Sequence, residues 1–136
     1  MTSETTHRAA TPIDGKVAIK DLPRPVAVKD TIVIKNKVSG VNYADIHQVS
    51  GKFPISESKI VGLENAGEVV EVGEGVTQFK VGDRVIALGQ PSHAEYSLLA
   101  ELDVKVRKIP ENVTYETAAA LAIQGLTAIT LVEKAY

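Results

Sequence analysis

Residues 62–88 read GLENAGEVVEVGEGVTQFKVGDRVIAL, and this stretch decides the fold. Short runs rich in valine are broken by Gly, Asp and Glu at close intervals, which is typical of short strands joined by tight turns. The two predicted strands are ENAGEVVEV (64–72) and RVIAL (84–88), and the Gly82-Asp83 pair before the second supplies turn chemistry. The stretch therefore predicts part of a β-barrel or β-sandwich.

The step Gly73-Glu74-Gly75 has two readings, a nucleotide-binding loop or a turn. A dinucleotide loop needs G-x-G-x-x-G between a strand and a helix, so that the pyrophosphate rests on the helix N-terminus. Here Gln78 stands where the third glycine belongs, and FKVGD follows in place of an amphipathic helix. Glu74 would also set a negative charge against a phosphate. We therefore interpret the step as a turn.

The alternation of apolar and polar residues continues on both sides and predicts three more half-buried strands. These strands lie at 31–38, 93–99 and 104–109. The polar, Thr-rich residues 1–13 show no comparable pattern, and we expect them to form a flexible tail. The β pattern ends at Pro110, so the predicted barrel domain covers residues 14–113.

Residues 114–136 carry a helical pattern instead. Thr114 is a predicted N-cap, and Glu116 is favourable in the first turn. YETAAALAI favours a helix, Gln124-Gly125 interrupts the pattern, and LTAITLVEKAY resumes it. The chain is therefore predicted to be mainly β, with two C-terminal helices over 115–123 and 126–136.

Composition excludes several classes of protein. The 15 Lys and Arg against 17 Asp and Glu leave a net charge of -2 without a basic stripe, which argues against a nucleic-acid partner. The longest apolar run, AAALAI at 118–123, is too short to span a membrane. No cysteine is present, so disulfides, thiolate nucleophiles and sulfur-ligated zinc are excluded. The start MTSETTHRAAT lacks the apolar core of a signal peptide, and we expect a cytoplasmic protein.

Four segments resemble the medium-chain dehydrogenase/reductase superfamily, and most of all its zinc-independent quinone oxidoreductases, the group that includes zeta-crystallin. They are GVNYADIHQVSGKFP (40–54), VGLENAGEVVEVGEGVTQFKVGDRV (61–85), HAEY (93–96) and ETAAALAIQGLTA (116–128). The pattern G-x-E-x-x-G-x-V followed by V-G-D-R-V is specific to the superfamily, and Q-G-L-T-A narrows the resemblance to the quinone reductase branch. The similarity runs from about Asp14 to Tyr136, but we find no counterpart of the family's opening strand in residues 1–13.

The resemblance implies a GroES-like β-barrel catalytic domain. In full-length relatives a Rossmann domain that binds NADPH follows it, and the Gly-rich loop of that domain is absent from these 136 residues. The resemblance thus implies the catalytic-domain portion of a longer enzyme, either a fragment or a truncated gene product. We expect weak or no NADPH binding by this chain alone.

Metal ligands are the first part of the site that the resemblance addresses. Zinc-dependent relatives carry a Cys and a His where Asn42 and Leu63 stand here, and an amide and an isobutyl group cannot replace them as zinc ligands. A site built from His47, His93 and Glu64 is disfavoured because no pair has the i, i+4 spacing of helical ligands. We expect no metal.

The predicted cofactor-binding residues are Asn42, Gln124, Gly125 and Thr127. The resemblance implies that the Asn42 amide holds the nicotinamide carboxamide or polarises a carbonyl oxygen, whereas the plain alternative is an Asn that caps a turn. Gly125 would let the ring approach the backbone, and Gln124 and Thr127 would fix which ring face is presented. The alternative is an ordinary helix with a glycine kink.

Two further residues complete the predicted site. His47 is a second catalytic candidate, because an imidazole can supply the proton that follows a hydride onto a quinone or enone; a surface histidine is the alternative. Phe53 stands where relatives place an aromatic residue at the substrate pocket, and a core Phe is the alternative. Glu64 is expected to be a structural carboxylate with a basic or backbone partner, and Asp45 to fix the loop of Asn42.

The first functional hypothesis is the catalytic domain of an NADPH-dependent quinone oxidoreductase, which transfers a hydride to a quinone or related conjugated carbonyl. An enone or alkenal double-bond reductase would use similar residues. A hypothesis from another class is a non-catalytic GroES-like module that serves in binding or assembly. Without a nucleotide-binding half, the apolar faces of the two C-terminal helices would be exposed, and we predict self-association through them.

Overall fold

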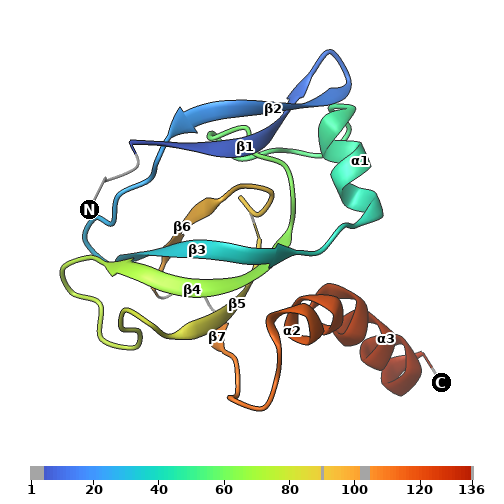
Figure 1. The fold of residues 1–136 in the computed structure, drawn as a ribbon. Coiled ribbons are helices and arrows are strands. Elements are labelled where there is room, and N and C mark those ends of the chain that lie inside the picture. The colour runs from blue at the N-terminus through green and yellow to red at the C-terminus, as the bar shows by residue number, and fades with distance from the viewer. Residues whose placement is uncertain (1–4, 90, 102–104, 136) are drawn as a thin grey trace.

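A computed structural model describes residues 5–89, 91–101 and 105–135 of the chain. Its centre is an antiparallel sheet of five strands in the order β6-β3-β4-β5-β7 (Figure 1). The strands are β3 (Thr31–Ser39), β4 (Glu64–Val72), β5 (Arg84–Leu88), β6 (Tyr96–Ala100) and β7 (Val106–Lys108). The strand predictions from residue 31 onward are confirmed, although β6 begins later than expected and β7 covers only part of the predicted 104–109, of which residue 104 lies outside the described residues.

A separate hairpin forms from β1 (Thr6–Ile13) and β2 (Lys16–Pro23). Its turn is Asp14-Gly15, and both residues have the positive φ that a two-residue hairpin turn requires. The prediction of a flexible tail over residues 1–13 is therefore wrong for residues 6–13, while residues 1–4 lie outside the described part. The strand is stabilised by pairing with β2 and by two backbone hydrogen bonds of Ala10, whose N–H donates to the His93 carbonyl and whose carbonyl accepts from the Val61 N–H.

The main hydrophobic core is formed largely by side chains from the strands of the central sheet. It is built from apolar side chains whose exposure is 8% or less: Ile32, Ile34, Val69, Phe79, Val85, Ala87, Leu99 and Val106. Val33 is also fully buried, so the first half of β3 is covered on both faces. The strand pattern predicted one buried face, whereas Ile32, Val33 and Ile34 are all buried, and the backbone edges of β3 are paired with β4 and β6.

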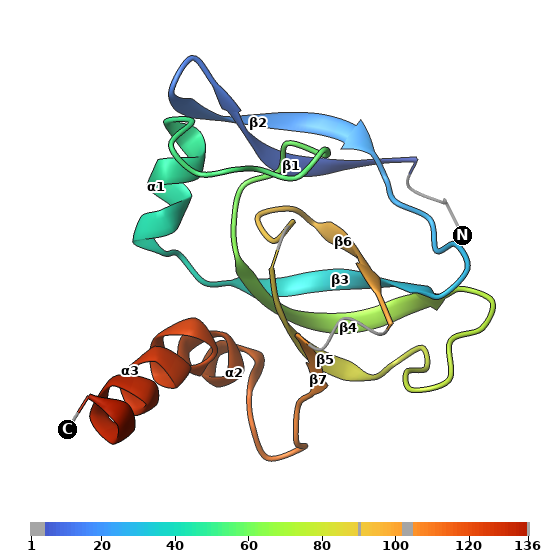
Figure 2. The same ribbon diagram turned by 180° about the vertical axis from the view of Figure 1, so that it is seen from behind.

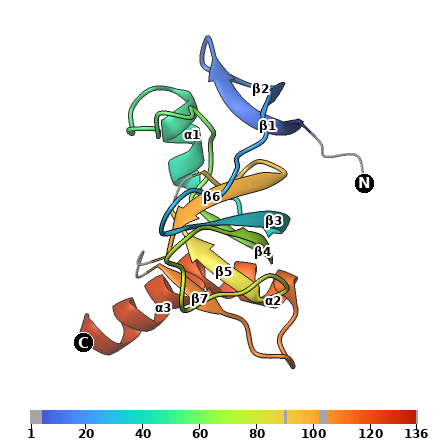
Figure 3. The same cartoon turned by 90° about the vertical axis from the view of Figure 1, so that its left-hand side faces the viewer.

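Three helices flank the strands. They are α1 (Tyr43–Val49), α2 (Tyr115–Leu121) and α3 (Ile123–Lys134). Figures 1 and 2 show the hairpin and α2–α3 on opposite sides of the central sheet, and Figure 3 shows the same order from the side. The short α1 was not predicted, and it packs beside the hairpin.

The two C-terminal helices meet at Ala122, where the chain bends by 42°. Thr114 caps α2 as predicted, because its side-chain oxygen accepts a hydrogen bond from the Thr117 N–H. Gly125 lies inside α3, so the predicted break at Gln124-Gly125 falls two residues earlier. Among the described residues no single helix is long and apolar enough to cross a membrane, although the bent pair passes that test by length and composition.

Candidate functional site

The loop between β3 and α1 meets the start of α3. The Asn42 Nδ2 donates to Glu64 Oε1 at 2.8 Å, and Gln124 Nε2 donates to Asn42 Oδ1 at 3.0 Å. Asn42 and Gln124 are 82 residues apart in the sequence. The fold therefore brings together two of the predicted cofactor-binding side chains in a direct contact.

Glu64 bonds both Asn42 and the first residue of α3, the helix that carries Gln124. It is fully buried at the start of β4, and its second oxygen accepts a hydrogen bond from the Ile123 backbone N–H at 2.8 Å. That N–H is one of the amides that a helix N-terminus leaves without an intrahelical partner, and a carboxylate is favourable there. The expected backbone partner of Glu64 is thus confirmed. The carboxylate links α3 to Asn42.

Glycine is required beside this carboxylate. A Cβ atom placed on Gly40 would lie 2.2 Å from Glu64 Oε1, far inside contact distance. The Gly40 N–H also donates to the Glu64 carbonyl at 3.2 Å. Gly40 therefore lets the loop that carries Asn42 pass close to the Glu64 side chain.

The two amides keep polar groups for a ligand. Asn42 uses one Nδ2 hydrogen and one Oδ1 lone pair in these contacts, and an amide offers a second of each. Gln124 is exposed on α3, with a carbonyl oxygen and a second N–H besides the bond to Asn42. Neighbouring donors and acceptors of this kind match a carboxamide, so the residues present fit the nicotinamide group that the sequence implied.

The remaining predicted cofactor residues follow on α3. Gly125 is half-buried, and its missing side chain would meet the Leu121 side chain at 3.4 Å. Thr127 is exposed and lies one turn after Gln124, on the same side of the helix. Within the described residues no hydrogen bond joins Thr127 to Asn42 or Gln124, so the fold places Thr127 near the pair without binding it to them.

An aromatic group forms the next part of the site. The His47 ring lies 5.0 Å from the ring of Phe53 and 5.1 Å, edge-on, from that of Tyr43, measured between centroids. The Phe53 and Lys52 N–H groups both donate to the His47 carbonyl, which fixes this loop against α1. The structure therefore brings His47 and Phe53 together. Tyr43 was not predicted as part of the site, although its spacing of four residues from His47 predicts a shared helix face.

A second pair joins α1 to the strand region. Asp45 is buried, and its Oδ2 accepts hydrogen bonds from the Asn42 N–H at 2.9 Å and from His93 Nε2 at 3.0 Å. The expectation that Asp45 fixes the Asn42 loop is confirmed by the first of these bonds. His93 was considered only as a metal ligand. Its partner lies 48 residues away, and no local pattern signals such a contact.

The described residues contain no cluster of side chains that could bind a metal ion. No three His, Asp or Glu side chains gather there closely enough to hold an ion. His93 is engaged with Asp45, and Glu64 with two amide N–H groups. The three residues considered for a metal site thus serve separate contacts.

Comparison with known proteins agrees with this architecture. Residues 28–124 match the family described as the alcohol dehydrogenase GroES-like domain. A Schizosaccharomyces pombe protein named "Probable quinone oxidoreductase" is 38% identical over 123 residues, which is 89% of this chain and 36% of that protein. The chain thus spans about a third of the length of this relative.

Solved structures give the same result. A quinone oxidoreductase from Pseudomonas syringae pv. Tomato DC3000 superimposes with a TM-score of 0.83 at 32% identity, over 96% of this chain and 42% of that one. A mycobacterial protein complexed with NADPH gives 0.80 at 32% identity, with the same coverage of 96% and 42%. The chain belongs to the alcohol dehydrogenase GroES-like domain family, in the medium-chain dehydrogenase/reductase superfamily, and has quinone oxidoreductases among its relatives.

Proposed function

We propose that this chain is the catalytic, metal-free half of an NADPH-dependent quinone oxidoreductase. The observation that carries the proposal is the Glu64–Asn42–Gln124 chain of hydrogen bonds, which presents two amides side by side at the start of α3. A relative solved with NADPH supports the choice of cofactor. The nucleotide-binding half would come from sequence outside these 136 residues.

NADPH supplies the hydride in this proposal. Asn42 and Gln124 would bind the carboxamide of the nicotinamide, and Thr127 would add a hydroxyl one turn further along α3. Glu64 fixes the Asn42 amide so that its N–H faces the carboxylate and its oxygen faces Gln124. A preset orientation of this kind lowers the entropic cost of bringing ring and acceptor together.

The acceptor would be a flat conjugated carbonyl compound, such as a quinone. Tyr43, His47 and Phe53 offer three neighbouring rings, and Tyr43 and Phe53 are 74% and 48% exposed. Offset or edge-on contacts between such rings contribute about 0.5–1.5 kcal/mol each beyond their buried area, which favours a planar substrate. An enone would use the same surface, so substrate assays must include both.

Substitution of Asn42 tests the proposal in the protein that carries this chain with its nucleotide-binding half. Asn42→Leu keeps the size of the side chain and removes both polar groups. We expect kcat/KM for quinone reduction by NADPH to fall about 10²-fold, as for the loss of one preorganised donor. Asn112→Leu, in an exposed loop, is the matched control and should retain the wild-type value. A wild-type protein that reduces neither quinones nor enones would refute the proposal.

The isolated chain provides a second test. We expect it to bind NADPH too weakly to detect at micromolar concentration and to reduce no quinone, because no strand–glycine loop–helix segment for the pyrophosphate occurs in its sequence. Titration calorimetry with NADPH measures this directly. Micromolar binding by the chain alone would contradict the assignment of cofactor affinity to the other half.

A further inference from the structure

Reduction of a quinone needs a proton as well as a hydride, and the geometry points to His93, oriented by Asp45, as the donor of that proton. This inference rests on the function proposed above and deepens it. The sequence had singled out His47 for the role. The structure distinguishes the two histidines by their partners and by the space around them.

His93 has the partner that a general acid requires. Its Nε2 lies 3.0 Å from Asp45 Oδ2, and the carboxylate is buried. A buried carboxylate fixes the orientation and tautomer of an imidazole, which is the arrangement that acid–base histidines use on unrelated folds. With Nε2 bound to Asp45, the other ring nitrogen, Nδ1, is the one that can give a proton to a ligand.

The same carboxylate oxygen connects His93 to the amide site. Asp45 Oδ2 accepts from the Asn42 backbone N–H at 2.9 Å and bonds His93 Nε2 at 3.0 Å. The two nitrogens are therefore separated by no more than two hydrogen-bond lengths. His93 thus lies beside the residue proposed to bind the nicotinamide, although the two residues belong to distant parts of the sequence.

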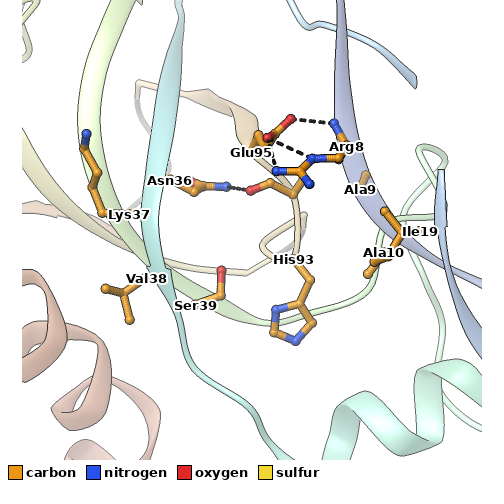
Figure 4. Close-up of a pocket in the computed structure, with 11 residues that line it drawn as sticks. Arg8, Ala9, Ala10, Ile19, Asn36, Lys37, Val38, Ser39, His93 and Glu95 are labelled. Atoms are coloured by element: carbon orange, nitrogen blue, oxygen red, sulfur yellow. Dashed lines mark hydrogen bonds and ion pairs between the residues drawn. The ribbon is translucent and has the colours of Figure 1, made fainter. Parts of the chain in front are cut away.

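The His93 ring also borders open space. It lines a pocket of about 300 Å³ between β3 and the β1–β2 hairpin, together with Ala10, Ile19, Val38 and Ser39. Figure 4 shows the ring pointing away from the Arg8–Glu95 ion pair and lying between Ser39 and Ala10. The His93 side chain is 19% exposed. A ligand in this pocket would contact the ring.

Charged groups around this pocket come from three elements. Arg8 of β1 and Glu95 are paired with each other at 2.9 Å, and Lys37 of β3 lines the same wall. Asp45 of α1 is the carboxylate that bonds the ring. Of these groups, Asp45 is the one that bonds the ring, and Figure 4 shows the Lys37 ammonium directed away from it.

His47 lacks a comparable setting. The described contacts of its ring are to the aromatic rings of Tyr43 and Phe53. Its role under the proposed function is then to complete the surface against which a planar substrate stacks.

Proton transfer from His93 would complete the reduction. A hydride, two electrons and one proton, passes from the nicotinamide to the quinone, so the cofactor is oxidised and the quinone becomes a hydroquinone monoanion. Nδ1–H of the protonated His93 then gives its proton to the anionic oxygen. The neutral imidazole that remains keeps its Nε2–H bond to Asp45, and it takes its next proton from water.

His93→Gln tests this assignment in the protein with its nucleotide-binding half. The glutamine Nε2 can take the place of the histidine Nε2 and donate to Asp45, so a purely structural role is retained while the proton donor is lost. We expect kcat to fall about 10²-fold at neutral pH, the lower end of the contribution of a positioned acid. The decline of kcat at high pH, where the donor loses its proton, should be absent from the variant.

His47→Asn is the comparison variant, and its pH profile should keep the decline at high pH. A second measurement uses His93→Gly with added imidazoles. Restored turnover should follow the acidity of the added imidazole, which mere filling of space would not produce. If His93→Gln fails to fold by circular dichroism, His93→Asn and the rescue series carry the test.

The outcomes separate this inference from the function beneath it. A wild-type protein without quinone or enone reductase activity would overturn both. An active wild-type enzyme whose His93→Gln variant keeps its kcat and its decline at high pH would overturn the role of His93 alone. If the His47→Asn variant instead loses the decline of kcat at high pH, His47 is the proton donor.

Discussion

Glu64 shows how much one buried side chain can determine at the scale of a residue. Its two carboxylate oxygens accept hydrogen bonds from Asn42 and from the first amide of α3, and neither donor carries a charge. Burial of a carboxylate is costly unless each oxygen finds donors. Both oxygens find one here, and the close approach of Gly40 completes the enclosure.

Glu64→Gln should therefore destabilise the chain although it changes only one atom. A glutamine offers one acceptor oxygen where two are needed, so its NH₂ group faces either Asn42 Nδ2 or the Ile123 N–H. One buried donor then lacks a partner, at a cost of about 1–3 kcal/mol. Urea unfolding of the chain measures the difference. Glu68→Gln, in the half-buried part of the same strand, should stay within about 0.5 kcal/mol. Equal stability of the two variants would contradict the stabilising role of the Glu64 carboxylate.

At the scale of the element, Asp83 joins two strands through the turn before β5. It accepts hydrogen bonds from the Lys80 N–H at 2.9 Å and from Lys80 Nζ at 3.0 Å, and it pairs with Lys108 of β7 at 2.9 Å. Burial alone would raise the pKa of Asp83, but the bonds from Lys108 and Lys80 outweigh it and lower the pKa to about 2. The turn is thus stabilised by an ionised carboxylate.

This shift predicts a dependence of stability on pH. The pKa of Asp83 is lower in the folded than in the unfolded chain, so its contribution is present in full above about pH 4 and is lost as the pH falls towards 2. Asp83→Asn should lower the free energy of unfolding by about 1–2 kcal/mol near pH 7, since both lysines are exposed and screened. Denaturant titrations at pH 7 and pH 2.5 should show the two proteins converging. Asp21→Asn, on exposed β2, is the control. A gap that persists at pH 2.5 would refute the assignment.

Sequence patterns predicted these elements unevenly, for physical reasons. The strands of residues 31–39, 64–72 and 84–88 were found because branched side chains alternate there. The first strand was missed because its buried residues are His7, Ala9 and Thr11, none of them typical of a core. The Asp14-Gly15 pair was the available signal of a hairpin.

The site depends on long-range contacts that local sequence patterns cannot predict. The resemblance to a family supplied Asn42 and Gln124, and their direct contact agrees with it. His93 could not be singled out as Asp45's partner, because their pairing depends on where α1 meets the segment before β6 rather than on residues near either one.

At the scale of the whole molecule, the most conspicuous feature is the uncovered side of α3. None of its residues is buried. Its large apolar side chains are more than half exposed: Leu126, Ile129, Leu131 and Val132. Their expected exposure is confirmed. Apolar clusters of this kind favour contact with another surface.

We predict that the isolated chain self-associates through α3. Val132→Lys should reduce the fraction of dimer or larger species in sedimentation velocity at equal protein concentration, without lowering the thermal midpoint. Val26→Lys, at an equally exposed valine near the hairpin, should leave the distribution unchanged. A wild-type chain that sediments as a monomer at all concentrations would contradict the prediction.

The bond from the Ile123 N–H to Glu64 has one more consequence. Helix α3 is held, at its first residue, by the carboxylate that also orients the Asn42 amide. A displacement of α3 would therefore be transmitted through Glu64 to Asn42, so the orientation of the Asn42 amide is coupled to the position of this helix.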